Sequence, residues 1–343
     1  MAGEAGPPRY NRGALFELTE QNAGRYLNEH THLGAGAWTI TLLGGGISNT
    51  VLLAESAERR VVLKQSLPKL RVAEDWPADR SRIRREWLAI ECVQARLPAG
   101  AVPAILFTDT ENCIFGMTAA PAGARTWKAH LLEGDVSSAM AHRIGVMLGI
   151  IITATRTSSA FEAEFGALAA FEQLRLDPYY AFTASRHPEL APYFEEAAEQ
   201  ARTRRVCLVH GDWSPKNFLV SENQAMAIDW EVAHYGDPSF DAAFLLNHLL
   251  LKSLHRPLWA TRYLDAARSF WSAVPGDGLG AREAFEEATC RHLGCLLLAR
   301  IDGKSPVEYI TSADDKERIR GIAARLIRRN AARLDEFYEE VAP

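Results

Sequence analysis

Apolar and polar residues alternate with a period of two over residues 37–43, and β-branched residues continue this pattern over 50–54 and 60–65. A glycine run at 44–46 separates the first two segments, and a polar turn separates the second from the third. We therefore predict three strands with a glycine-rich loop after the first. Upstream of them, Thr19 is placed to cap a helix that runs to about His30.

The spacing changes to a helical one over residues 79–97, where Ile83, Trp87 and Ile90 recur among arginines and glutamates. Two short strands are predicted near 104–108 and 113–118. The following stretch, AAPAG at 119–123, contains the proline and glycine expected of a boundary between two lobes.

Beyond this boundary the pattern is mostly helical, with one β island. The island has predicted strands at 206–209, 218–220 and 225–229. Helices are predicted at 126–132, 138–155, 161–175, 189–203, 238–254, 257–272, 281–301 and 313–340. Strands followed by helices indicate an α+β chain. We divide it into a tail (1–14), a β-rich N-lobe (15–118), a hinge (119–124) and a helical C-lobe (125–343).

Composition narrows the classes of function. The 343 residues carry 38 Lys+Arg against 43 Asp+Glu, a net charge of -5, so we expect no nucleic-acid partner held by a basic surface. The five cysteines are scattered, which favours a reducing, cytoplasmic setting. The apolar stretches at 144–154 and 242–251 are shorter than a bilayer requires, and we expect no membrane association.

The densest chemical signal is the pair of blocks HGDWSPKN at 210–217 and AIDWE at 227–231, each following a short apolar strand. Loops that leave neighbouring strands would bring Asp212, Asn217 and Asp229 together. Carboxylate and amide oxygens suit Mg²⁺, and phosphoryl transfer needs a further Asp to orient the attacking hydroxyl. A simple turn followed by a strand is the structural alternative, but the upstream glycine loop and lysine favour chemistry.

That loop includes Gly44, Gly45 and Gly46, whose backbone N–H groups could approach phosphate oxygens, with Ser48 or Asn49 as an added donor. A bare glycine run is otherwise typical of a flexible hairpin tip. Lys64, in an apolar strand, makes phosphate binding the better interpretation, although a lysine there could also protect a sheet edge.

Together, these blocks resemble the aminoglycoside phosphotransferase and choline kinase superfamily, relatives of the protein kinases. The resemblance implies a bilobal fold, ATP and Mg²⁺ as cofactors, and Asp212 as the catalytic residue. It also implies that Lys64 binds phosphate and pairs with Glu86, and that Thr118 and Ala120 flank the adenine. In the segment GDPSFD at 236–241, the resemblance implies that the second Asp, Asp241, holds the catalytic loop.

Within the superfamily, the chain partly resembles methylthioribose kinases, through LKQSLP at 63–68 and the Asp-x-Glu form of 229–231. This resemblance implies that Glu231 joins Asn217 and Asp229 as a metal ligand. It leaves the acceptor open among a sugar, a thio-sugar, an amino alcohol and an aminoglycoside-like molecule. Oligomeric state is left open too, and a non-catalytic nucleotide-binding or scaffolding relative is the alternative function.

Other charged and titratable residues in the chain bear on the acceptor and on the choice of base. Acidic clusters at Glu195, Glu196 and Glu199 and at 335–340 are the candidate contacts for a polycationic antibiotic, although such clusters are usually solvated faces. Lys216 is interpreted as a solvated loop lysine, with a contact to phosphate or an acidic substrate as the alternative. His210 is predicted to be a hydrogen-bonded structural residue, because Asp212 fits the role of base.

Overall fold

The computed structural model describes residues 16–33, 36–43, 49–67, 82–222, 224–275 and 281–342. The predicted tail and the candidate residues Gly44, Gly45, Gly46 and Ser48 lie outside this part of the chain. Internal contacts divide the chain into one unit of residues 1–84 with 105–119 and a second of 85–104 with 120–343.

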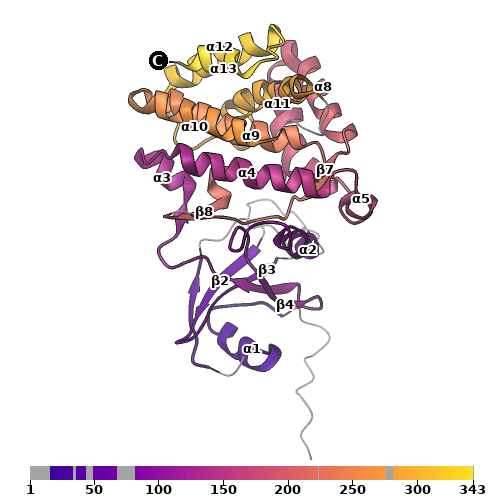
Figure 1. Ribbon diagram of the computed structural model, residues 1–343, viewed down its shortest axis with the longest axis vertical. Coiled ribbons are helices and arrows are strands. Elements are labelled where there is room, and N and C mark those ends of the chain that lie inside the picture. The colour runs from indigo at the N-terminus through magenta and orange to yellow at the C-terminus, as the bar shows by residue number, and fades with distance from the viewer. Residues whose placement is uncertain are drawn as a thin grey trace, which may run out of the picture. The chain divides into compact units, whose positions relative to one another are not determined.

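The first unit contains a five-stranded antiparallel sheet in the order β1-β2-β3-β5-β4 (Figure 1). The strands and the helix of this unit are β1 (Thr39–Leu42), β2 (Asn49–Glu55), β3 (Arg60–Ser66), β4 (Ile105–Asp109), β5 (Ile114–Thr118) and α1 (Ala23–His30). Tyr26 and Leu27 of α1 pack in one core with Leu52 and Leu63 of the sheet. The predicted strands are thus present, and their shared apolar positions account for the packing of α1.

The start of α1 differs from the prediction. The helix begins at Ala23, and the Asn22 side chain accepts a hydrogen bond from the Thr19 backbone N–H at 2.8 Å. Residues 19–22 therefore form a turn before the helix, and the predicted cap at Thr19 is wrong. A threonine and an asparagine both satisfy local backbone groups, so the sequence alone did not distinguish the two positions.

The second unit is mainly helical and carries two small sheets, β7-β10 and β6-β8-β9. Its strands are β6 (Arg125–Thr126), β7 (Cys207–Val209), β8 (Phe218–Ser221), β9 (Gln224–Ala227) and β10 (His234–Gly236). Its longer helices are α3 (Trp127–Glu133), α4 (Ser138–Thr155), α5 (Ser159–Phe165), α8 (Ala191–Thr203), α9 (Pro238–His255), α10 (Ala260–Ala273), α11 (Arg282–Asp302), α12 (Ala313–Arg328) and α13 (Leu334–Val341). Short helical segments are α6 (Ala169–Phe171), η1 (Glu172–Ala181), α7 (Phe182–Arg186), η2 (Pro188–Leu190), η3 (Pro215–Asn217) and η4 (Pro257–Trp259), while α2 (Arg82–Gln94) begins in the first unit.

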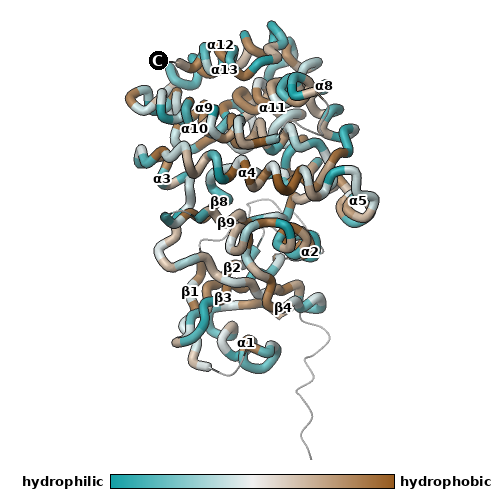
Figure 2. The backbone as a smooth tube through the Cα atoms, viewed as in Figure 1, coloured by the Kyte–Doolittle hydropathy of each residue, from teal (hydrophilic) through white to brown (hydrophobic). Residues whose placement is uncertain are grey.

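Helix α9 is the centre of the second unit, because every residue from Pro238 to Leu254 is buried. Helix α10 packs against α4 and α9, and α11 packs against α9 and α12 (Figure 1). Among the described residues, α4 is the one helix long and apolar enough to cross a bilayer, and 56% of that stretch is buried inside the protein. Hydrophobic residues run along α4 in Figure 2, and its packing is that of a core helix.

Two predicted helices are interrupted in the structure. The segment predicted at 161–175 divides into α5, α6 and the π-helix η1, which contains Pro178. Pro178 has no N–H to donate to the preceding turn, so a regular α-helix cannot continue through it. The segment predicted at 313–340 divides into α12 and α13 around Asn330, whose φ of 54° is left-handed. Strand β10 was not predicted, because its three residues carry no periodic signal.

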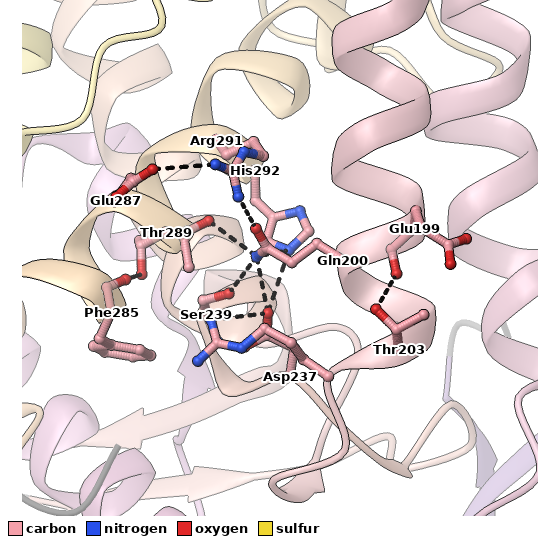
Figure 3. A network of polar contacts seen from close by, with 12 residues as sticks. Glu199, Gln200, Thr203, Asp237, Ser239, Phe285, Glu287, Thr289, Arg291 and His292 are labelled. Atoms are coloured by element: carbon pink, nitrogen blue, oxygen red, sulfur yellow. Dashed lines mark hydrogen bonds and ion pairs between the residues drawn. The ribbon is translucent and has the colours of Figure 1, made fainter. Parts of the chain in front are cut away.

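A buried polar network fixes the first turn of α9 (Figure 3). The Gln200 side-chain nitrogen, from α8, lies 2.8 Å from Asp237 Oδ2 and 3.0 Å from His292 Nε2 of α11. Asp237 Oδ1 in turn accepts the Ser239 backbone N–H at 3.0 Å and caps α9. Three helices are thereby joined at the end of α9 that carries Asp241.

Candidate active site

The loop after β7 turns sharply at Gly211, where φ is +77°. A Cβ there would lie 3.0 Å from the Val232 backbone oxygen, so both the conformation and the space require glycine. Asp241, in the first turn of α9, accepts the backbone N–H groups of His210 at 2.7 Å and Gly211 at 2.9 Å. The buried helix α9 therefore holds the loop in one geometry, the role that the sequence resemblance implied for this Asp.

His210 joins the two sequence blocks. Its Nδ1 accepts the Asp212 backbone N–H at 3.1 Å, and its Nε2 lies 3.0 Å from the Ile228 backbone oxygen. One nitrogen accepts and the other donates, so the ring is neutral. Burial lowers its pKa to about 4. The prediction of a hydrogen-bonded structural histidine is confirmed.

Asp212 is 2% exposed and is held by two cations. Arg175 Nη2 and Lys216 Nζ each lie 2.8 Å from the same oxygen, Asp212 Oδ2. Burial acts to raise the pKa of Asp212, but the charges of Arg175 and Lys216 outweigh it and hold that pKa well below its usual range. The carboxylate is therefore ionised at neutral pH.

Sequence reasoning missed Arg175 and one contact of Lys216. Arg175 lies in η1, and its Nε also donates to the Gly211 backbone oxygen at 2.7 Å, so it contacts the loop twice. The one available signal was an arginine between two leucines, Leu174 and Leu176. The interpretation of Lys216 as a solvated loop lysine is incomplete: the side chain is 53% exposed, as expected, but its ammonium group also pairs with Asp212.

The second block lies directly beside the loop. Asn217 Nδ2 donates to the Asp212 backbone oxygen at 2.9 Å, and the Ile228 N–H donates to the Asn217 backbone oxygen at 2.9 Å. Asp229 follows with φ of 67°, a left-handed conformation that is uncommon outside glycine and is often found at functional sites. Strands β8 and β9 pair as a hairpin, which brings Asn217 and Asp229 to the same end of it.

These residues offer oxygen ligands but no preformed cage. Asp229 and Glu231 are half-buried, and both act electrostatically on Arg175. Within the described ranges, no three His, Cys, Asp or Glu side chains form a group that could hold a metal ion. Mg²⁺ is typically bound by one or two carboxylates together with substrate phosphates, so an Asn, an Asp and a Glu fit its chemistry.

The remaining candidates lie on both units. Lys64 is 4% exposed and lies on β3, where it pairs in register with Val51 and Phe115. Asn49 begins β2 and Thr118 ends β5, whereas Glu86, on α2, and Ala120 belong to the second unit. Glu86 is 1% exposed. The pairing of Lys64 with Glu86 and the adenine contacts stay predictions.

Two buried histidines predict acid sensitivity. Burial lowers the pKa of His234 to about 3 and that of His210 to about 4, from an ordinary value of 6.5. Between pH 6.5 and these lowered values, each histidine is therefore neutral in the folded protein and protonated in the unfolded chain. A lowered folded-state pKa means that stability is lost as pH falls below 6.5, by up to about 1.4 kcal/mol per pH unit for each histidine. Urea unfolding at pH 6.5, 5.5 and 4.5 measures this loss.

The variant His234→Asn isolates one of the two groups. Asparagine can keep the donor that faces the Val232 backbone oxygen, 3.0 Å from His234 Nδ1, but it does not titrate. Carboxyl groups such as Asp241, whose pKa burial raises to about 7, change with pH in both proteins and cancel in the difference. The wild type should lose stability relative to the variant as pH falls. Parallel curves would contradict a buried, neutral His234.

Comparisons with known proteins agree with this geometry. Residues 39–285 match a family model described as the phosphotransferase enzyme family. A methylthioribose kinase of Escherichia coli O45:K1 (strain S88 / ExPEC) is 26% identical over 253 residues, 65% of this chain and 59% of the relative. The chain thus matches less than two thirds of the length of that relative.

Solved structures show a similar fold. A spectinomycin phosphotransferase, APH(9)-Ia, in complex with ADP and spectinomycin has a TM-score of 0.57 at 10% identity, over 91% of this chain and 98% of that one. An amicoumacin kinase in complex with AMP-PNP, Ca²⁺ and its antibiotic has a TM-score of 0.53 at 14% identity, over 89% and 90%. At these identities the likeness concerns the fold, and it agrees with the predicted kinase-like arrangement of a β-sheet region before a helical one.

Proposed function

Because the chain belongs to the phosphotransferase enzyme family, we propose that it is a small-molecule kinase that transfers a phosphoryl group from ATP, with Mg²⁺, to a hydroxyl of a polar acceptor. The observation that carries this proposal is the ionised Asp212 on a loop fixed by Asp241, directly beside Asn217 and the strand end that carries Asp229. The ADP and AMP-PNP complexes of proteins with this fold support ATP as the donor.

In this proposal, Asp212 orients the acceptor hydroxyl and takes its proton. A carboxylate with so low a pKa is a weak base, so its main contribution is position. That suits phosphoryl transfer, in which the bond to the leaving oxygen is largely broken before the hydroxyl must lose its proton. Arg175 and Lys216 keep Asp212 ionised and in place.

Asn217, Asp229 and Glu231 would hold Mg²⁺, which neutralises charge on the phosphates when bound. Lys64, braced by Glu86, would contact phosphate oxygens, and Asn49 would add a donor beside the glycine loop. Thr118 and Ala120 would flank the adenine. These assignments rest on the sequence resemblance.

The test measures ADP formation with ATP, Mg²⁺ and a panel of sugars, amino alcohols and aminoglycosides, in the wild type and in Asp229→Asn. A neutral amide is a poorer ligand for a divalent cation. The variant should therefore need about ten-fold or more Mg²⁺ for half-maximal activity, with a lower maximal rate.

Asp265→Asn is the matched control, because Asp265 is a surface carboxylate on α10 with 57% of its side chain exposed. Asp265→Asn should leave the Mg²⁺ concentration for half-maximal activity and the maximal rate unchanged. An unaltered Mg²⁺ requirement in Asp229→Asn would remove the metal role. A wild type that forms no ADP with any acceptor would overturn the proposed activity and favour a non-catalytic relative.

A further inference from the structure

A line of contacts leads away from Asp212 through basic and aromatic side chains. Arg175, which holds Asp212, is followed one helical turn later in η1 by Tyr179. The Tyr179 hydroxyl accepts a hydrogen bond from Arg300 Nη1 of α11 at 2.9 Å, and the Arg300 guanidinium lies 5.5 Å from the centroid of the Tyr179 ring. A second buried cation is thus joined through Tyr179 to η1, the helix whose Arg175 contacts the catalytic loop.

A further branch of this line runs along α9. The Tyr179 ring is 5.7 Å from that of Phe244, which is 5.6 Å from the ring of His248. One turn on, Lys252 Nζ donates to the His248 backbone oxygen at 3.3 Å and lies 4.9 Å from the centroid of the Tyr309 ring. Three elements, η1, α9 and α11, therefore contribute to one basic cluster, made up of Tyr179, Phe244, His248, Lys252 and Arg300.

Arg300 and Lys252 are unusual because they are buried without a counter-charge. Lys252 is 0% and Arg300 is 9% exposed, yet no carboxylate of the described residues lies within 4.0 Å of either. Arg300 Nη1 donates to uncharged acceptors, the Tyr179 hydroxyl and two oxygens of Ser305, whereas the buried Arg300 Nε has no hydrogen-bond acceptor among the described residues. Buried charges in proteins are normally paired, since an unpaired one loses its hydration without compensation.

The surroundings of Lys252 add to this imbalance. Lys128 is already paired with Glu308, whose carboxylate also acts favourably on Lys252 but from beyond ion-pair distance, and the other near charge is Arg300. Burial, with Lys128 and Arg300, lowers the pKa of Lys252 to about 7. An anion bound between Arg300 and Lys252 would supply the missing charge and the missing acceptor.

We infer that the acceptor carries an anionic group, a carboxylate or a phosphate, which Arg300 and Lys252 bind while its hydroxyl lies at Asp212. The inference rests on the proposed function for the position of the hydroxyl, whereas the anion site can be tested without turnover. It also disfavours polycationic antibiotics, and two of the acidic residues that could bind them are already paired with arginines. Glu196 pairs with Arg291 at 3.1 Å, and Glu340 pairs with Arg325 at 2.7 Å.

The first experiment measures binding by calorimetry without nucleotide, using pairs of probes in which one member carries an anionic group that the other lacks. Gluconate is compared with sorbitol for a carboxylate, and ribose 5-phosphate with ribose for a phosphate; choline and kanamycin are the cationic probes. At least one anion should bind ten-fold or more tightly than its neutral partner, and the better pair identifies the anionic group. Equal affinities in both pairs, no binding of either anion, or tighter binding of a cation would overturn the inference.

The second experiment repeats the binding with Arg300→Gln and Lys252→Met, two independent changes that keep much of each side chain's volume. Each should remove most of the preference for the anion. Arg268→Gln is the matched control, because Arg268 also lies over a tyrosine ring, at 5.0 Å from the Tyr338 centroid, but contacts none of the cluster residues by hydrogen bond or ion pair among the described residues. An unchanged anion preference in both cluster variants would overturn the inference.

Turnover then separates the two proposals. Charge-dependent binding without ADP formation would support the anion site and contradict the kinase activity. ADP formation with sorbitol, ribose or choline and no preference for an anion would support the kinase activity and overturn the anion site. In an active enzyme, Arg300→Gln should raise KM for the anionic acceptor at least ten-fold while kcat changes little, since the guanidinium binds the acceptor away from the transferred group.

Discussion

Asp212→Ala should lower kcat on the order of hundreds-fold or more, while the affinity for ATP stays near that of the wild type. The carboxylate is expected to contact the acceptor hydroxyl and not the nucleotide, so orientation and proton transfer are lost together. Steady-state turnover, with ATP binding measured by thermal shift, checks both parts. A variant that keeps most of its kcat would show that another group positions the hydroxyl.

Stability must be followed in the same variant. Removing Asp212 leaves Arg175 buried beside Lys216 without their shared partner, and breaking a buried ion pair from one side costs about 3–5 kcal/mol. Asp212→Asn keeps the shape of the side chain and can still accept a hydrogen bond. If both variants are folded at the assay temperature and inactive, the loss belongs to chemistry and not to unfolding.

Arg175→Gln should lower kcat about a hundred-fold, although Arg175 itself is not expected to contact the acceptor. It holds Asp212 through one nitrogen and the Gly211 backbone through another, and a misplacement of about 1 Å at a reacting group can cost this much. Arg175→Lys should recover only part of the rate, because an ammonium group restores the charge but not the two-point contact.

Lys216→Gln is the matched comparison for Arg175. Lys216 has the same 2.8 Å distance to the same oxygen, but its side chain is 53% exposed and it makes one contact to the loop. Kinetics of the three variants should therefore rank Arg175→Gln as the most damaged. A full recovery in Arg175→Lys, or a larger loss in Lys216→Gln, would mean that charge alone matters.

The sequence predicted those features that depend on local pattern. Strand patterning located β1 to β5, and the two dense polar blocks located Asp212, Asn217 and Asp229 because each block follows a short apolar strand. It could not predict Arg175 or Arg300. Their roles come from where η1 and α11 pack against other elements, and a single arginine in a helix carries no signal of the residue it will meet.

Because local sequence does not reveal tertiary packing, it also did not predict the ion pair of Lys216 or the irregular helices at 161–175. A lysine in a loop is usually solvated, and only the fold places the carboxylate of Asp212 within its reach. Likewise, the apolar spacing that continued through 175 was helical, but Pro178 converts its end to a π-helix. That wider helix carries both Arg175 and Tyr179, the two residues that connect the loop to the basic cluster.

The contacts around the catalytic loop also bear on the order in which the chain folds. They close short loops of chain: 18 residues from His210 to Ile228, 31 from His210 to Asp241, and 36 from Arg175 to Gly211. The entropy lost on closing a loop grows with its length, so contacts of this range form at lower cost than those that join distant segments. Most of the loop geometry can therefore form once η1, β7 and α9 have packed, and α11 completes it through the contact of His292 with Gln200 at the first turn of α9.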